Sequence, residues 1–176
     1  MAIMLKLSLR IPDTTYRKDI KKMSSAKEYI DDFKANYEQF MLSCDAVEEE
    51  GKWPKDELGE MNAYFMNDFA CVIIRLVAAD GKVDKGELDF LNDALGFDYK
   101  AEELEELYKN DGDRIDAYFE TELDDSLAMI KGINEKLAES FKNLLVMVGK
   151  IVVESDGVVT EEEKGTAQKL IEALDK

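Results

Sequence analysis

Apolar residues recur every three or four positions along most of this chain, the spacing that places them on one face of an α-helix. The first such stripe covers Ile30–Val47 and predicts a helix that begins at Ser25 and extends for about 24 residues. The next stripe, Met61–Val77, is broader, so we expect this helix to be the most buried and to lie at the centre of the bundle. Between them, Pro54 suits a first helical turn, where its missing N–H is harmless.

The rest of the chain continues the helical spacing. It predicts a short helix over Lys85–Leu95, short solvated helices in the acidic stretch 100–125, a long helix through Leu137–Val152 and a last helix over Glu161–Leu174. Only two prolines and ten glycines interrupt 176 residues, which favours long helices over a fold with many turns. The predicted fold class is therefore all-α, a compact multi-helix bundle.

The N-terminus follows a different pattern. Apolar residues occupy every second position from Ile3 to Ile11, the period of a strand with one apolar face, and Pro12 ends the run. Residues 1–22 hold six basic and two acidic side chains, so we expect a basic arm ahead of a helical domain over residues 23–176. The strand could pair with a second copy and support a homodimer, or pack on the bundle. In a further interpretation, Met23 is the natural start and the preceding segment is an upstream extension or a flexible arm.

An internal near-repeat is the most informative feature of the chain. The segment Ala79–Glu87 is followed 76 residues later by the similar segment Ser155–Glu163. Each copy comes after a long apolar helix and before a short amphipathic one, which indicates a duplicated supersecondary unit. We therefore expect two pseudo-symmetric helix–turn–helix halves.

The spacing within each copy suits a turn between two helices. A glycine can adopt the left-handed conformation, a β-branched residue points inward, and a capping residue starts the next helix, with a glutamate at its third position. The corresponding pairs are Gly81 with Gly157, Val83 with Val159, Asp84 with Thr160, and Glu87 with Glu163. Two capping boxes of this kind explain the turns without any ligand.

These residues resemble the hallmark of the tellurite-resistance TerB-like family. The match consists of an apolar helix followed by Ala79-Asp80-Gly81, a β-branched residue, a capping residue and a glutamate, and it covers roughly residues 60–175 as two halves. The first copy matches more fully, because the second has Glu154-Ser155 where alanines are typical. The resemblance implies an all-helical, pseudo-symmetric domain linked to tellurite and other stress responses. It also implies no demonstrated enzymatic activity, and acidic clusters suggestive of metal binding.

Carboxylates at the two turns are the candidate metal ligands. An EF-hand loop starting at Asp80 fails, because Lys82 stands at its third position and Leu91 at its twelfth. A cation such as Ca²⁺ or Mg²⁺ would instead need carboxylates from separate turns, and the candidates are Asp80, Asp84, Glu87, Asp156 and Glu163. Helix capping and solvation are the competing explanation for the same carboxylates.

Composition narrows the function classes. The net charge of −17 repels nucleic acid and anionic membranes and favours basic protein surfaces or divalent cations, unless it serves solubility alone. The absence of histidine excludes Ser–His–acid and Cys–His catalysis as well as histidine-containing zinc sites. Cys44 and Cys71 both lie in apolar helical patterns, as expected of reduced core thiols in a cytoplasmic protein. The longest apolar run, which ends at Val153, is too short for an integral membrane segment.

We therefore predict a non-enzymatic, TerB-like acidic helical module in the cytoplasm. It would act in a stress response as an interaction or sensing domain with a protein partner and weak divalent-cation binding. The alternative is a purely structural helical interaction protein with no ligand.

Overall fold

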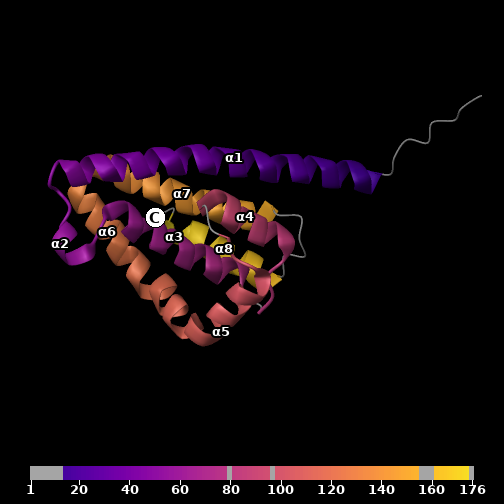
Figure 1. Cartoon of the computed structure of the whole chain (residues 1–176). Coiled ribbons are helices and arrows are strands. Elements are labelled where there is room, and N and C mark those ends of the chain that lie inside the picture. Colours follow the sequence, from indigo (N-terminus) through magenta and orange to yellow (C-terminus); the bar gives the residue numbers. More distant parts are fainter. Residues whose placement is uncertain (1–13, 79–80, 96–97, 155–160, 175–176) are drawn as a thin grey trace, which may run out of the picture.

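A computed structural model describes residues 14–78, 81–95, 98–154 and 161–174, and these residues form helices joined by short connections (Figure 1). The elements are α1 (Thr14–Glu49), α2 (Lys55–Leu58), α3 (Met61–Val77), α4 (Lys85–Leu95), α5 (Ala101–Ala117), the π-helix η1 (Tyr118–Glu122), α6 (Leu123–Ile133), α7 (Glu135–Glu154) and α8 (Glu161–Leu174). No strand occurs within these ranges. The predicted all-α, compact multi-helix bundle is confirmed.

Helix α3 lies at the centre of this arrangement, as its broad apolar stripe predicts. It contacts α1, α2, α4, α5, η1, α7 and α8. Helix α1 crosses one side of the bundle and packs along α7, whereas α5 lies at the opposite edge and α6 runs from there back toward α1 (Figure 1). An apolar surface on nearly every side of α3 therefore meets a neighbouring helix.

An aromatic cluster forms the middle of the core. Phe141 on α7 stacks on Phe40 of α1 at a centroid distance of 5.7 Å. The same ring meets Phe65 and Phe69 of α3 edge-on, at 5.1 and 5.0 Å. These four side chains are almost completely buried. Offset and edge-to-face rings add to the stabilisation from burial, so Phe141 ties three helices together.

The structure differs from the sequence prediction at two element boundaries. Helix α1 begins at Thr14 rather than at Ser25. The added residues include good helix formers such as Arg17, Lys18 and Met23 but lack a regular apolar stripe, so a prediction from apolar spacing misses them. In the acidic stretch, α5 is a single helix of 17 residues that passes through η1 into α6, and it is longer than the short helices expected.

The repeated organisation of the two halves is visible in the order of the helices. A long helix and then a shorter one occur as α3 with α4 and again as α7 with α8. Helix α4 begins at Lys85 and α8 at Glu161, which reproduces the 76-residue spacing of the sequence repeat. The predicted strand over Ile3–Ile11 lies outside the described residues.

Candidate functional site

The five predicted metal ligands are only partly placed by the structure. Asp80 and Asp156 lie outside the described residues. Glu87 and Glu163 belong to α4 and α8, but their side chains are also outside the described part. Asp84 is half-buried directly before α4, and its carbonyl oxygen accepts a hydrogen bond from the Leu88 N–H at 3.0 Å. Asp84 therefore stands where an N-cap residue is expected.

The first Asp-Gly turn is held against α5. Gly81 has a φ of +78°, in the left-handed region that favours glycine. Val83 is buried, as predicted, and its N–H donates to Glu105 Oε1 at 3.1 Å. A hollow of about 520 Å³ beside the turn is lined by Gly81 and by Glu102, Glu105 and Glu106 among others. Among the residues described, however, no group of three or more acidic or cysteine side chains is arranged to hold a metal ion.

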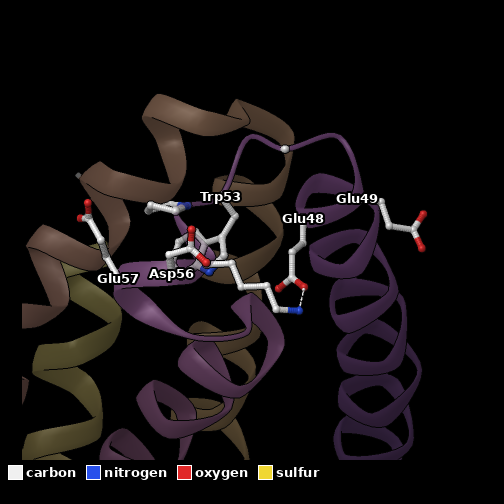
Figure 2. A pocket seen from close by; sticks show the side chains of 8 residues that line it. Glu48, Glu49, Trp53, Asp56 and Glu57 are labelled. Carbon is white, nitrogen blue, oxygen red and sulfur yellow. Dashed lines mark hydrogen bonds and ion pairs between the residues drawn. The ribbon is translucent and has the colours of Figure 1, made fainter.

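A second hollow, of about 410 Å³, lies at the corner between α1 and α2 and has a structural explanation. Figure 2 shows Glu48 pointing from α1 toward Lys55, whose Nζ lies 2.5 Å from Glu48 Oε1, while Glu49 points away. Glu48 Oε2 also accepts the Met61 N–H at 2.9 Å, at the start of α3. These two interactions hold the pKa of Glu48 below its usual range, the Lys55 hydrogen bond having the larger effect.

Trp53 completes this corner. It is buried, its Nε1–H donates to the carbonyl oxygen of Gly59 at 2.7 Å, and its ring lies against Tyr64 and Phe65. The polar groups best placed to bind a ligand are thus already used to join α1, α2 and α3. We therefore assign the corner a structural role.

A third feature is an exposed acidic surface on α5, η1 and α6. Residues 101–133 contain eleven acidic and three basic side chains. We use the name α5–α6 acidic surface for the exposed carboxylates of Glu102, Glu106, Asp111, Asp113, Glu120, Glu122, Asp124 and Asp125. None of these eight forms an ion pair with another residue in the described part of the chain. The surface therefore carries a concentrated negative charge that this part of the structure leaves uncompensated.

Contacts with α3 hold this surface in place. Arg75 of α3 pairs with Asp116 of α5, Nε to Oδ1, at 2.5 Å. Its guanidinium also lies over the Phe119 ring, 5.8 Å from the centroid, and the Tyr108 hydroxyl donates to Asp116 at 2.9 Å. The half-buried position of Arg75 favours these contacts, since less water competes for the charges. The acidic surface is consequently presented on a fixed framework.

The least expected feature is a buried carboxylate next to that surface. Asp68 of α3 is only 6% exposed, and Tyr118 of η1 is only 8% exposed. The Oδ2 atom of Asp68 and the hydroxyl oxygen of Tyr118 are shielded from solvent, and neither has a hydrogen-bond partner among the described residues. Buried polar atoms are rarely left in this state, because each loses its bonds to water without replacement.

A groove of about 320 Å³ opens beside Asp68. We name it the Asp68 groove, and its lining includes Tyr64, Asp68, Cys71, Arg114, Tyr118 and Glu122. An adjoining hollow of about 280 Å³ shares Tyr64 and Glu122 and adds Asp125 and Ser126 of α6. Glu122 and Asp125 belong to the α5–α6 acidic surface as well, so the groove lies at the border of that surface.

The electrostatics of the groove follow from burial. Burial raises the pKa of Asp68 to about 6; the hydroxyl groups of Ser126 and Tyr118 oppose this shift, and the charge of Glu122 adds to it. Burial and then the Asp68 charge raise the pKa of Tyr118. The Cys71 thiol also has a raised pKa, chiefly through burial and then through Asp68. Asp68 is thus ionised at neutral pH only at a cost in free energy, which a cation in the groove would reduce.

The π-helix places Tyr118 and Glu122 at this groove. A π-turn widens the helix by one residue and often marks a functional position. Here the hydroxyl of Thr121 donates to the carbonyl oxygen of Ala117 at 2.7 Å, within the widened turn. Wide turns of this kind have no clear apolar period, so the sequence pattern did not predict η1.

The position of Asp68 in the sequence is itself informative, although a search for apolar spacing does not detect it. It stands three residues after Phe65 and four before Val72, in phase with the most apolar stripe of the chain. A polar residue at such a position is more informative than the apolar ones around it. Its neighbours Tyr118 and Ser126 come from distant parts of the chain, and only the fold brings them together.

None of the helices in the described ranges is long and apolar enough to cross a membrane. Comparison with known proteins finds no match, since no family model, no curated protein and no solved structure matches this chain. The resemblance to TerB-like domains therefore rests on the residues of the two Asp-Gly turns.

Proposed function

We propose that this chain is a non-enzymatic, TerB-like interaction module that binds a basic protein partner through the α5–α6 acidic surface. The observation that supports this most directly is the set of eight exposed carboxylates on that surface, which lack ion pairs within the described structure. A concentrated negative surface attracts positively charged partners and speeds their association. The resemblance suggests that the module acts in a stress response, and the two free thiols favour a cytoplasmic location.

The two thiols support a role in binding rather than in catalysis. Burial raises the pKa of Cys44 to about 12, and the charges of Asp45 and Glu48 add to the effect. The Cys71 pKa is raised as well. Since the thiolate is the reactive form, both groups are poor nucleophiles at neutral pH. Without histidine in the sequence, the usual general base for a nucleophile is also missing.

The test is affinity capture from an extract of the source cells, followed by identification of the bound protein and calorimetry with the purified partner. We expect a partner with a basic surface and an affinity that falls as salt is raised. The triple variant Glu102→Gln, Glu106→Gln, Asp113→Asn should lose most of this binding, because all three carboxylates are exposed on α5 and have no ion pair in the described structure.

A matched control removes the same charge elsewhere. Glu38→Gln, Glu49→Gln and Glu57→Gln change three exposed carboxylates on α1 and α2, and this variant should keep the partner. An equal loss of partner binding in both variants would show that binding depends on the net charge of the chain and not on the α5–α6 acidic surface. Undiminished binding by the α5 variant would contradict the proposal and favour a purely structural protein that uses another surface.

Weak divalent-cation binding at the Asp-Gly turns is a second candidate function. The three glutamates that α5 brings beside Gly81 add to the negative charge around the turn that contains Asp84 and would attract a hydrated cation, although the described residues include no group of three ligands placed to bind one directly. Few protein ligands and many waters imply an affinity no tighter than about 10⁻⁴–10⁻³ M. The melting temperature should rise in several millimolar calcium or magnesium at constant ionic strength, and less so after Asp84→Asn and Glu87→Gln. An unchanged melting temperature would count against this site.

A further inference from the structure

Two buried polar atoms without a hydrogen-bond partner in the described structure belong to residues that line one groove. Asp68 Oδ2 and the Tyr118 hydroxyl oxygen both belong to residues more than nine-tenths buried, and both residues line the Asp68 groove. The Ser126 and Tyr118 hydroxyls lie near enough to stabilise the Asp68 charge, but neither completes a hydrogen bond to Oδ2. More than 90% of such buried groups are normally hydrogen-bonded, so an additional donor beside this pair would be favourable. The terminal torsion of an aspartate is broad, so a small rotation would turn Oδ2 toward a ligand in the groove.

The charge of the groove selects a cation. Asp68 and Glu122 both line it, and Glu122 is close enough for its charge to disfavour ionisation of Asp68. Two carboxylates that face one small space repel each other unless a positive charge lies between them. Arg114 also lines the groove, but its side chain is exposed, and it forms no ion pair in the described structure.

The number of acceptors favours an ammonium group. Asp68, Tyr118 and Glu122 offer three acceptor groups, and an ammonium carries three N–H donors. A guanidinium is bound best by a carboxylate that offers both oxygens in one plane, whereas Asp68 Oδ2 is shielded from solvent. A metal ion is disfavoured because no group of three suitable ligands occurs among the residues described.

The position of the groove identifies the source of the ammonium. Glu122 and Asp125 belong both to the α5–α6 acidic surface and to the hollows around Asp68. A basic protein bound to this surface would therefore place its cationic side chains at the mouth of the groove. The rings of Tyr64 and Tyr118 and the side chain of Ile115 provide a wall for the methylene stem of a lysine.

We infer that the Asp68 groove receives one lysine side chain of the basic partner, whose ammonium is bound by Asp68, Tyr118 and Glu122. This inference rests on the proposed function, because it gives the partner one anchoring residue within a larger electrostatic contact. Such an anchor, desolvated and paired with a buried charge, contributes to specificity more than exposed charges at the rim do.

The inference is tested on the full chain without its partner, using butylammonium chloride as the probe because it has the shape of a lysine side chain. We expect saturable changes in the amide resonances of residues 67–71 and 118–122 at pH 7.5 and constant ionic strength. Butanol, which has the same stem without the charge, should cause none of them. Asp68→Asn should weaken butylammonium binding at least about tenfold.

Three further variants distinguish binding of butylammonium in the groove from a general effect of negative charge. Glu38→Gln removes one exposed charge from α1, outside both the groove and the α5–α6 acidic surface, and binding should be unchanged. Glu122→Gln, also at an exposed position, should weaken binding and serves if Asp68→Asn fails to fold. Arg114→Gln should tighten binding, because it removes a competing positive charge from the groove.

The outcomes divide clearly. An absence of saturable changes in the wild type, equal affinity in Asp68→Asn, or the same changes with calcium chloride would overturn the inference. If butylammonium does not bind but the α5 triple variant still loses its partner, the groove does not bind a lysine side chain, and the proposed function of the acidic surface is unaffected. If partner binding fails while butylammonium binds as expected, the groove recognises an ammonium and the wider interface must be sought elsewhere.

Discussion

At the scale of single residues, Asp68 contributes most to the properties of this molecule that an apolar pattern does not show. Its position in the stripe of α3 is evident in the sequence, but its burial, its free oxygen and its neighbours on η1 and α6 depend on the fold. Sequence reasoning selected carboxylates in turns, where they are usually solvated caps. It passed over Asp68, a carboxylate whose buried environment raises its pKa.

The raised pKa of Asp68 predicts a specific pH dependence of stability. The pKa is 3.8 for an aspartate carboxyl exposed to water and about 6 in the folded chain, so the folded state binds the proton more tightly. Stability from this group is therefore greatest below pH 4 and falls as pH rises toward 6, by up to about 3 kcal/mol. In Asp68→Asn this contribution disappears, and the variant should gain stability relative to wild type between pH 4.5 and pH 7.5.

Urea unfolding at the two pH values measures this difference. Because the chain carries many other carboxylates, the informative quantity is the change in the free-energy difference between variant and wild type. Cys71, Arg114, Tyr118, Glu122 and Ser126 face the same group and remain in both proteins. Glu120→Gln should show no comparable change, and an Asp68→Asn difference that is independent of pH would contradict the assignment.

The thiols provide a second prediction at this scale. The pKa of Cys44 rises from 9.0 to about 12, which lowers its thiolate fraction at pH 8 on the order of a thousandfold. Alkylation by iodoacetamide should accordingly be slow in the native chain and fast in urea. Cys71 is partly exposed and should react first. The variant Cys71→Ser isolates Cys44, and a native rate equal to the unfolded rate would show that Cys44 is accessible.

At the scale of elements, the sequence prediction succeeded where one side of a helix is apolar. Helices α4 and α8 were predicted with their observed bounds, and the apolar stripe Met61–Val77 coincides with α3, because a regular stripe indicates the buried face directly. The start of α1 was missed because residues with high helix propensity carry no such stripe. The π-turn was missed because one additional residue in a turn changes only which side chains point inward.

Two glycines provide a matched test of the turn between α3 and α4. Gly81 has a left-handed φ of +78°, whereas Gly165 is an exposed residue within α8, and a Cβ at either position would meet no atom within 4 Å. Gly81→Ala should destabilise the chain by about 1 kcal/mol through backbone strain. Gly165→Ala should stabilise it by about 0.5–1 kcal/mol, because alanine is the better helix former.

Chemical denaturation of the two variants and the wild type gives both values. Since neither methyl group has a steric contact, the opposite signs would arise from the backbone alone. Stabilisation by Gly81→Ala would show that the turn does not require the left-handed conformation. That result would also weaken the explanation of the Asp-Gly repeat as a helix-capping turn.

At the scale of the whole molecule, charge and core have separate locations. The large side chains of α1, α3 and α7 fill the interior, and the strongest negative surface lies on α5, η1 and the start of α6. Helix α5 lies at the edge of the molecule opposite α1 (Figure 1). The net charge of −17 was evident from composition, but its concentration on one surface required the fold. A composition argument could thus suggest a basic partner without locating its binding surface.

The last prediction concerns the unity of the core. Phe141 contacts rings from α1 and α3, so its removal should weaken all three helices at once. Phe141→Ala should lower the free energy of unfolding by about 3–5 kcal/mol, from lost burial and from the cavity left behind. Leu42→Ala changes a side chain of α1 that is 58% exposed, and it should have an effect within about 0.5 kcal/mol.

Denaturation followed both by far-ultraviolet circular dichroism and by Trp53 fluorescence should give coincident transitions for each variant, because α1, α3 and α7 share one core. Transitions that separate in Phe141→Ala would show instead that the corner around Trp53 unfolds independently of the helices that Phe141 joins.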